Sequence, residues 1–412
     1  MTNKTKKIFD QIDNSRDEII HLQSELTSKV ALGPENGGTG EHDKTEFIYN
    51  LLNNLHPDFI KVYEAPDSRA KGGTRPNLVV RWNGTDNTST VWVLCHADVV
   101  PPGDLSLWKA DPYRVTVEGD RITGRGVEDN QHGFVSFYLA IKYILENRNR
   151  LSRSTGLVLV ADEETGSKYG LDFLLNHHGD LFCKNDIIIV PDGGNEDGTM
   201  IEIAEKSMLW LKFTVTGQQC HASTPEKGRN TLLAMAQLTV TLYEALKKKF
   251  ACHDDIFSPP LSTFEPTKVE SNVQNVNTIP GKDVFYMDCR ILPSYTTEEV
   301  LRFIKDVCRK TGNMSGIMID VKPVQRLDAP NPTPVDSPVV KILSRAIKAV
   351  TGRDAKPMGI GGGTIAAFFR QANLPAAVWS TVSDSAHQPD EFCLISNIMS
   401  DAKVFAYIFT TG

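Results

Sequence analysis

Runs of consecutive apolar residues mark the first half of the chain at Val91–Leu94, Leu157–Ala161 and Ile187–Val190. Each run is rich in branched side chains and ends in polar residues, which is typical of strands buried on both faces of a parallel sheet. Between the first two runs, residues 134–147 have the apolar spacing of a helix, as residues 5–30 do near the amino terminus. We therefore expect an α/β fold in which helices cover a mostly parallel mixed sheet.

A different pattern begins near Leu209, where apolar and polar residues alternate through Thr216 as in a half-exposed strand. The elements expected after it are a helix at 230–249, strands near 261–275 and 284–291, a helix at 297–310 and a strand at 317–324. This β-α-β-β-α-β order predicts an α+β domain that resembles a ferredoxin-like unit. Five prolines between Pro323 and Pro338 suggest a linker, after which the α/β pattern resumes. We expect one domain from residues 1–208 and 325–412, with residues 209–324 inserted into it.

Composition narrows the range of functions. The 412 residues suit two domains, and 44 basic against 51 acidic side chains give a net charge of −7 without a basic run, which argues against nucleic acid as a partner. No stretch approaches the roughly 18 apolar residues of a membrane span. The amino terminus, Met1–Lys7, has no apolar segment after its lysines and does not read as a secretory signal. The seven cysteines are scattered and never form C-x-x-C, so we expect reduced thiols in a cytoplasmic protein.

Polar residues with metal-binding side chains follow the apolar strands, and others lie in two loops. They are His96, Asp98, Asp129, Glu163, Glu164, Asp192 and His387. Each residue alone could be a surface or structural polar group. Carboxylates gathered at neighbouring strand ends repel one another and are costly to bury unless cations hold them, which favours a metal site. Two imidazoles and even three of these carboxylates exceed the four ligands of one zinc ion and suit two divalent ions bridged by a carboxylate.

These residues stand in motifs that carry a family resemblance. The matching segments are Cys-His96-Ala-Asp98-Val-Val-Pro, Trp108 with the following Asp-Pro-Tyr, Gly124-Arg-Gly with Asp129-Asn, Asp-Glu163-Glu164-Thr-Gly, Pro-Asp192-Gly-Gly, His221-Ala-Ser-Thr-Pro and His387-Gln-Pro. In this order the chain resembles the dinuclear zinc metallohydrolase family that contains acetylornithine deacetylase, succinyl-diaminopimelate desuccinylase, aminoacylase, carboxypeptidase G and tripeptidase T.

The resemblance implies a role for each member of the metal cluster. His96 and Asp192 would bind one metal, Glu164 and His387 the other, and Asp129 would bridge both. The ions would be zinc, with cobalt and manganese as alternatives, because imidazole and carboxylate ligands accept all three.

The resemblance also implies roles for the two remaining acidic residues. Glu163 would be the general base that activates a water between the metals. Asp98 would orient His96 by a hydrogen bond to its other ring nitrogen. A cis peptide at Asp129-Asn130 is implied as well.

The inserted domain would serve in dimerisation and as a lid. In dimeric family members the position of His221 reaches the partner's site and stabilises the oxyanion. Asn277 and Arg290 match substrate-contacting positions, although Arg290 could equally form a surface ion pair. The glycine loop with Gly362, Gly363 and Thr364 lacks the Lys-Ser/Thr of a phosphate-binding loop, and the family uses it for a substrate carboxylate.

The function expected from these residues is a dimeric two-metal hydrolase that cleaves an amide bond of N-acyl amino acids or short peptides. The segment from Val99 to Trp108 favours the desuccinylase and deacetylase branch of the family. A dipeptidase or carboxypeptidase is the alternative enzyme. A metal-binding dimeric scaffold without catalysis is the alternative outside enzymes, and the intact Glu163 argues against it.

Overall fold

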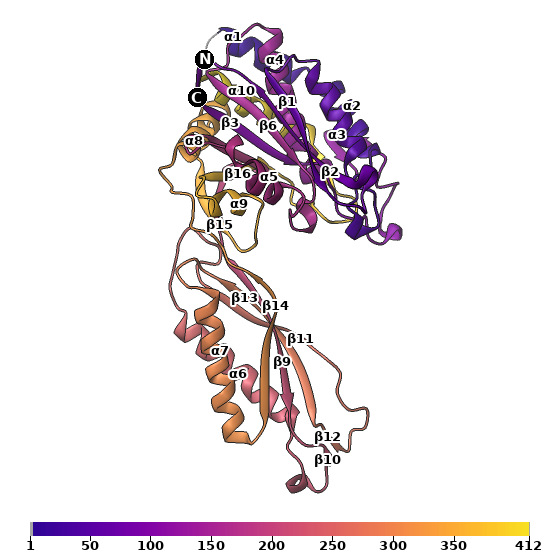
Figure 1. The fold of residues 1–412 in the computed structure, drawn as a ribbon, viewed down its shortest axis with the longest axis vertical. Helices are drawn as coiled ribbons and strands as arrows, with labels where there is room; N and C mark the ends of the chain where they lie inside the picture. Colours follow the sequence, from indigo (N-terminus) through magenta and orange to yellow (C-terminus); the bar gives the residue numbers. More distant parts are fainter. Residues whose placement is uncertain (1–2, 412) are drawn as a thin grey trace. The chain divides into compact units, whose positions relative to one another are not determined.

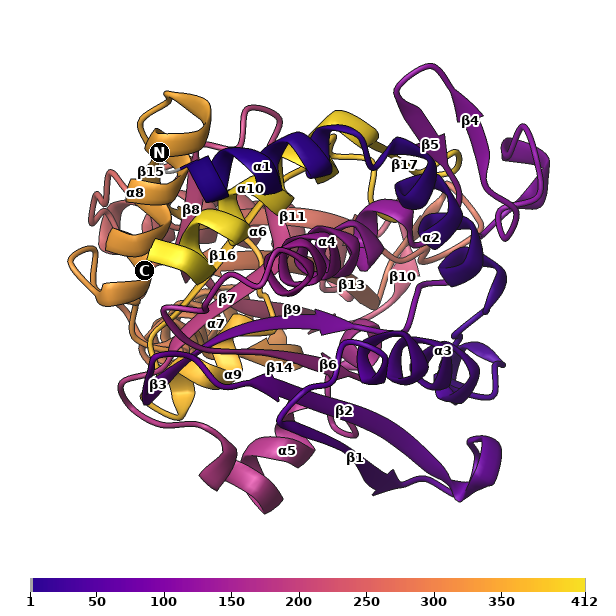
Figure 2. The same cartoon turned by 90° about the horizontal axis from the view of Figure 1, so that it is seen from above.

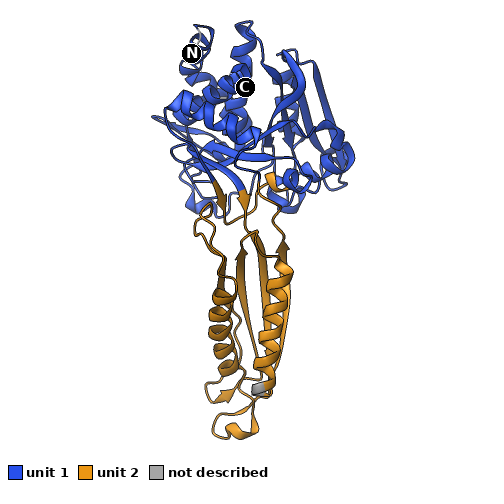
Figure 3. Cartoon of the chain, turned by 90° about the vertical axis from the view of Figure 1, so that its left-hand side faces the viewer, with its two compact units in different colours: residues 1–203, 333–357, 368–412 blue, residues 204–332, 358–367 orange. Residues whose placement is uncertain are grey.

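The computed structural model describes residues 3–411, apart from the side chains of residues 314 and 315, and the chain divides into two compact units. The first unit contains residues 1–203, 333–357 and 368–412, and the second contains residues 204–332 and 358–367 (Figure 3). The hydrophobic pattern placed the divisions at 208/209 and 324/325 and did not show that residues 358–367 join the second unit. The roles of the units as catalytic and dimerisation domains stay predictions. Sequence expectations for residues 1, 2 and 412 lie outside the described part.

A mixed sheet with strand order β1-β2-β6-β3-β7-β16-β8-β15 forms the centre of the first unit (Figure 1). Its strands are β1 (Phe59–Pro66), β2 (Thr74–Trp82), β3 (Asp86–His96), β6 (Arg153–Val160), β7 (Ile187–Asn195), β8 (Met200–Glu205), β15 (Lys356–Ile360) and β16 (Ala376–Thr381). The four neighbours β6, β3, β7 and β16 are parallel, whereas β1, β2 and β8 pair antiparallel. The expected α/β fold with a mixed sheet is confirmed, but the sheet is not mostly parallel, since three of these pairings are parallel and three are antiparallel.

The apolar runs of the sequence are the middles of three of these parallel strands. Val91–Cys95 of β3, Leu157–Val160 of β6 and Ile187–Val190 of β7 are buried throughout. Such strands alternate side chains between two faces, so a run that is apolar at every position requires cover on both faces.

Helices supply this cover. Those of the first unit are α1 (Asn3–Asp13), α2 (Arg16–Ser28), α3 (His42–Asn53), α4 (His132–Glu146), α5 (Leu171–His178), α8 (Pro338–Thr351), α9 (Ala366–Gln371) and α10 (Ile395–Thr411). α4 is apolar on nearly all sides because it contacts β3 and β7 on one side and α1 and α10 on the other (Figure 2). Throughout residues 3–411, every helix is either too short or too polar to cross a membrane.

Several sequence expectations need correction. The single helix expected over residues 5–30 is two helices, α1 and α2, because the chain turns at Asn14 and Ser15, whose side chains bond the carbonyls of Asp10 and Ile12. The linker expected from Pro323 begins too early, since Pro323 still lies in a strand, next to a register shift where a missing N–H is tolerated.

The second unit has an antiparallel sheet of order β11-β13-β9-β14, covered by two helices. Its elements are β9 (Ser207–Thr216), β10 (Cys220–His221), α6 (Thr231–Lys249), β11 (Thr263–Val269), β12 (Thr278–Ile279), β13 (Lys282–Ile291), α7 (Thr297–Ser315) and β14 (Met318–Leu327). The expected β-α-β-β-α-β order is confirmed, with β10 and β12 as an added short ribbon. The side chain of Asn230 caps α6, and a Thr296/Glu299 capping box begins α7.

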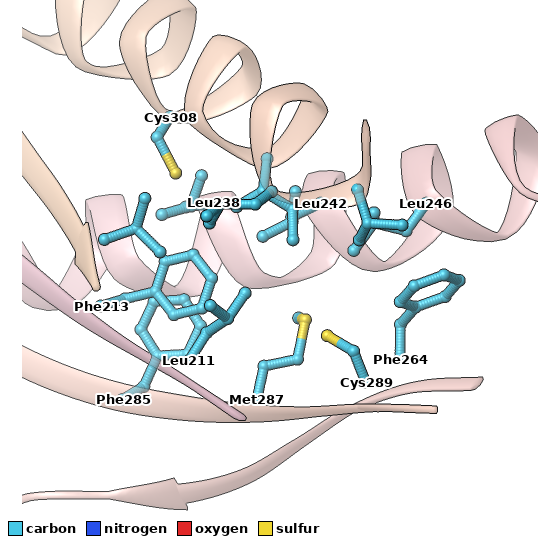
Figure 4. Packing of buried hydrophobic residues seen from close by; sticks show 14 of the residues in the cluster. Leu211, Phe213, Leu238, Leu242, Leu246, Phe264, Phe285, Met287, Cys289 and Cys308 are labelled. Carbon is cyan, nitrogen blue, oxygen red and sulfur yellow. The ribbon is translucent and has the colours of Figure 1, made fainter. Parts of the chain in front are cut away.

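The core of the second unit lies between this sheet and its helices (Figure 4). Leu209, Leu211, Phe213 and Val215 of β9 are fully buried, while the residues between them face outward, as the alternation in the sequence indicates. Phe213 stacks on Phe285 of β13 at 4.3 Å between ring centroids.

Phe213→Ala should therefore lower the free energy of unfolding of the second unit by about 3–5 kcal/mol, because it leaves a cavity beside Phe285. Thr214→Ala on the same strand faces outward and should change it by no more than about 0.5 kcal/mol. Native-state hydrogen exchange of the β9 and β13 amides measures both variants. Equal effects of the two substitutions would contradict the assignment of the inner face.

Candidate metal centre

Four neighbouring parallel strands bring the candidate ligands to one edge of the large sheet. His96 is the last residue of β3, Asp192 lies in β7, and His387 follows β16. Glu163 and Glu164 lie in the short 3-10 turn after β6. The carboxyl ends of parallel strands are where ligands bind in α/β sheets, so the topology itself gathers these side chains.

Asp129 lies in the middle of this group and touches both imidazoles. Its Oδ1 is 2.8 Å from Nε2 of His96, and its Oδ2 is 3.0 Å from Nε2 of His387. It lies in the turn Val127–Gln131 directly before α4, where Asp129 and Asn130 have non-helical backbone angles, and the Asp129-Asn130 peptide is cis, as the resemblance implied. Asp129 therefore has one oxygen toward each side of the cluster, as a bridging ligand requires.

The other candidate ligands extend the cluster on the two sides of Asp129. His387 Nε2 lies 3.1 Å from Glu164 Oε2, and His96 Nε2 lies 3.4 Å from Asp192 Oδ1. Ligand atoms lie within 4.8 Å of one another in two groups of three, which are His96 with Asp129 and Glu164, and His96 with Glu163 and Asp192. Glu163 is thus as close to Asp192 as a ligand would be.

The donor set fits divalent cations. Four carboxylates from Asp129, Glu163, Glu164 and Asp192 gather around two imidazoles, and such a set is costly without positive charge. Oε1 of Glu164 is buried and has no hydrogen-bond partner among the described residues. Oxygen and imidazole donors are the ligands that zinc, manganese and cobalt accept.

The pKa values show how strongly the groups act on one another. Burial and then the charge of Asp192 raise the pKa of Glu163 well above its ordinary value, and burial raises the pKa of Glu164 to about 7 and that of Asp192 to about 6. Burial acts in the same direction on Asp129, but hydrogen bonds with His387 and His96 outweigh it and lower its pKa. Hydrogen bonds to Asp129 and Glu164 raise the pKa of His387 to about 10. A cation would compete with these protons for the same atoms.

Asp98 is in contact with His96, but its carboxylate has another partner. The backbone carbonyl of Asp98 lies 3.0 Å from Nδ1 of His96, whereas the carboxylate oxygen lies 3.6 Å away. The carboxylate instead accepts the backbone N–H groups of Glu163 and Glu164, both at 3.1 Å. A proton on Nδ1 that is donated to this carbonyl leaves Nε2 of His96 free for the cluster.

Sequence reasoning missed two buried acidic residues beside the ligands, Glu128 and Glu391. Glu391 accepts the backbone N–H groups of Glu128 and Asp129, and Glu128 accepts that of Ser385. The only available signal was position, since Glu128 precedes Asp129 and Glu391 closely follows His387.

The candidate substrate-binding residues all lie in the second unit and form two pairs there. Ala222, next to His221, donates its N–H to the carbonyl of Asn277 at 2.8 Å, which places His221 and Asn277 on the same short ribbon. His221 is exposed, and its Nδ1 lies 2.7 Å from Ser223 Oγ. Arg290 donates to the carbonyl of Gly361 at 3.0 Å, next to Gly362 and Gly363.

These two pairs lie at opposite ends of β13. The ribbon leads directly into Lys282, and Arg290 is near the far end of the strand (Figure 1). A rise of about 3.4 Å per residue separates Lys282 from Arg290 by about 27 Å. Within one second unit, His221 and Arg290 therefore do not meet at one small substrate.

Two of these residues have partners inside the second unit. Arg290 is paired with Asp288 through two bonds of 2.8 and 3.0 Å, so part of its charge is neutralised. Thr364 donates its hydroxyl to Glu205 at 2.6 Å. Among the described residues, nothing lies within 4 Å of a Cβ placed at Gly362.

A mixed sheet with imidazole and carboxylate side chains at its carboxyl edge defines the chain as a metal-dependent hydrolase. Residues 92–411 match peptidase family M20/M25/M40, and the chain belongs to this family. It is accordingly a metal-dependent peptidase or amidohydrolase.

Similar proteins agree with this family. An uncharacterised metallohydrolase of Methanococcus maripaludis is 40% identical over 409 residues, which cover 94% of this chain and 98% of that protein. A succinyl-diaminopimelate desuccinylase of Gluconobacter oxydans is 28% identical over 301 residues, 72% of this chain and 74% of that protein. The structure of human carnosine dipeptidase 1 has the same fold, with a TM-score of 0.71 and 18% identity over 99% of this chain and 98% of that one.

Proposed function

We propose that the protein hydrolyses an amide bond of N-acyl amino acids or short peptides at a centre of two divalent metal ions. The observation that carries the proposal is the position of Asp129, which offers one carboxylate oxygen to each of the two imidazoles, those of His96 and His387. Membership of a peptidase family supports peptide or acyl amino acid substrates.

In the proposed centre, His96 and Asp192 would hold one ion, Glu164 and His387 would hold the other, and Asp129 would hold both. When bound, the ions would lower the pKa of water and polarise the amide carbonyl oxygen. Zinc is the proposed metal, with cobalt and manganese as alternatives, because the donors are imidazoles and carboxylates alone.

Glu163 is the proposed general base and acid. Its carboxylate lies within 4.8 Å of the ligand atoms of His96 and Asp192, within reach of a water at this centre from which it would take a proton to return to the leaving nitrogen. The carboxylate of Asp98 holds the turn of Glu163 through the two backbone N–H bonds described above, and the carbonyl of Asp98 orients His96. Asp98 would thus position both a ligand and the base.

We further propose a homodimer in which His221 and Asn277 serve the site of the partner subunit. The distance along β13 supports this, because one second unit cannot bring His221 and Arg290 to the same substrate. Exposed apolar side chains on α6 (Leu232, Leu233 and Val240, 47–60% exposed) and the edge strand β11 offer a surface for a second copy.

Mixing two inactive variants tests this arrangement. His221→Ala and Glu163→Gln homodimers should both have little activity, and mixed dimers should regain part of it, because one of their two sites has both residues intact. Activity of the mixture that stays at the level of the separate variants would contradict action in trans. Light scattering gives the oligomeric state in the same samples.

The expected substrate is an N-acyl amino acid, and the glycine loop and Arg290 are the proposed contacts for its carboxylate. Metal-loaded protein should be assayed against N-succinyl-diaminopimelate, N-acetylornithine and a panel of dipeptides. Faster turnover of an acyl amino acid supports the proposal, and turnover of dipeptides alone would replace it with an exopeptidase.

A cytoplasmic location is proposed from the seven unpaired thiols.

A further inference from the structure

Two buried carboxylates connect the loop that carries Asp129 with the loop that carries His387. The first is Glu391, which is fully buried and lies between His387 and the short strand β17 (Phe392–Leu394). One of its oxygens accepts the backbone N–H groups of Glu128 and Asp129 at 3.0 and 3.1 Å. The other accepts the N–H of Gly126 at 3.1 Å and a guanidinium N–H of Arg125 at 2.6 Å.

The second carboxylate is Glu128, which is 3% exposed and directly precedes Asp129. One of its oxygens accepts the backbone N–H of Ser383. The other lies 2.6 Å from both the backbone nitrogen and the hydroxyl of Ser385, two residues before His387. All of these partners belong to the first unit.

The two connections run in opposite directions. Glu391 belongs to the loop of His387 and binds the backbone around Asp129, whereas Glu128 belongs to the loop of Asp129 and binds the backbone before His387. Apart from the guanidinium of Arg125, each partner is a backbone N–H or the hydroxyl of Ser385, so these bonds fix the course of the chain. Together they set the spacing of two loops whose ligands meet at 3.0 Å.

The loop of His387 depends on support from outside. Asp384, His387 and Asp390 have φ values of 55°, 65° and 56°, in the left-handed region that side chains other than glycine seldom adopt. Such residues persist only when surrounding structure holds them. The side chain of His387 is 54% exposed, so its own packing does little to fix its position.

Among the described residues, a backbone bond also joins the two loops, where the N–H of Gly124 bonds the carbonyl of Glu391 at 2.9 Å. β17 pairs with β5 (Arg121–Thr123) from Phe392 onward, and the N–H of Lys109 bonds the carboxylate of Asp390 at 2.9 Å. None of these contacts reaches the residues just before His387. Glu128 is therefore the connection that reaches the residues just before His387, and Glu391 is the one that reaches the backbone of Asp129.

We propose that Glu128 and Glu391 are positioning residues that form a reciprocal clamp and place Asp129 and His387 at ligand distance. Neither carboxylate is itself a ligand in this arrangement, and each acts through backbone that it holds. The inference rests on the proposed metal centre, because its consequence is tighter binding of metal between Asp129 and His387.

A merely structural role would lower stability alone, so the test measures metal affinity separately. Zn²⁺ dissociation constants of the Glu128→Gln, Glu391→Gln and Ser385→Ala variants are obtained by competition with a chromophoric chelator. Each should rise by about 10- to 100-fold, the range for residues that support metal ligands. Ser385→Ala removes one hydroxyl and keeps the proposal testable if a glutamate variant fails to fold.

Glu202→Gln is the matched control. Glu202 is 1% exposed in the same unit and pairs through bonds of 2.9 and 3.1 Å with Arg370, which lies on α9 rather than on either ligand-bearing loop. It should lower the melting temperature as the clamp variants do, and leave the Zn²⁺ affinity within about twofold of the parent. Zn²⁺ affinity that falls equally in this control would overturn the clamp.

Two further results test reciprocity. The Glu128→Gln/Glu391→Gln double variant should bind Zn²⁺ about as weakly as the weaker single variant, because either loss releases both loops, whereas independent effects would multiply. In metal-free protein, Glu391→Gln should speed hydrogen exchange of Ser383 and Ser385, whose N–H groups bond Glu128. Multiplying effects, or unchanged exchange at these two amides, would overturn the clamp.

The exchange result separates this inference from the proposed function, since it needs neither metal nor substrate. If Asp129→Asn left the Zn²⁺ affinity unchanged, the proposed metal centre itself would be refuted. If Asp129→Asn bound Zn²⁺ weakly while both glutamate variants bound it normally, the clamp would be refuted and the proposed metal centre would stand.

Discussion

Glu163→Gln is expected to lower kcat by about 10²- to 10⁴-fold and to leave the metal content unchanged. Glutamine keeps the size of the side chain but cannot take a proton from water at neutral pH. The backbone N–H of the residue still bonds Asp98, so the turn that presents it should be retained. Metal analysis and steady-state kinetics on the same preparation measure the two effects together.

The neighbouring residue provides the matched control for this variant. Glu164 lies in the same turn, and its Oε2 is 3.1 Å from His387, as expected of a ligand. Glu164→Gln should lower metal content and activity together, and excess metal should restore part of the activity. A Glu163→Gln protein that lost metal while it kept residual activity would reverse the assigned roles.

Asp129→Asn is expected to have the largest effect on metal binding, because one carboxylate serves both sides of the cluster. Saturating metal should stabilise the parent protein by about 4 kcal/mol at a thousand times the dissociation constant, and removal of metal by a chelator should reverse this. The variant should show little of this stabilisation, because an amide replaces the negative charge that both ions share.

Thermal unfolding with and without Zn²⁺ measures this prediction. Asp111→Asn is the control, since Asp111 is exposed and only caps a turn by accepting the N–H of Tyr113 at 2.9 Å. It should keep the full metal-dependent shift in melting temperature. An equal shift in Asp129→Asn would show that the metal binds elsewhere.

Prediction from the sequence succeeded where local pattern and tertiary burial coincide. Strands buried on both faces must be apolar at every position, so the apolar runs predicted β3, β6 and β7. The polar residues at the ends of these runs then indicated His96, Asp192 and the two glutamates as candidate ligands. β1 and β8 were missed because they carry no comparable apolar run.

The hydrophobic pattern of the sequence could not predict contacts between segments that are far apart along the chain. The bond from Glu391 to the N–H of Asp129 spans 262 residues and involves backbone, which every residue has. The same reason explains Asp98, whose carbonyl rather than carboxylate lies at hydrogen-bonding distance from His96. Asp129 and His387 were visible as candidates in two loops, and the resemblance alone implied their roles as ligands.

The central claim is that Asp129 bridges two divalent ions, and a crystal structure of the metal-loaded protein with anomalous difference maps tests it most directly. The account predicts two peaks about 3.5–4 Å apart, one next to His96 and Asp192, the other next to Glu164 and His387, with Asp129 between them. Peaks that do not contact Asp129, or a single ion held by His96, Glu163 and Asp192, would contradict it.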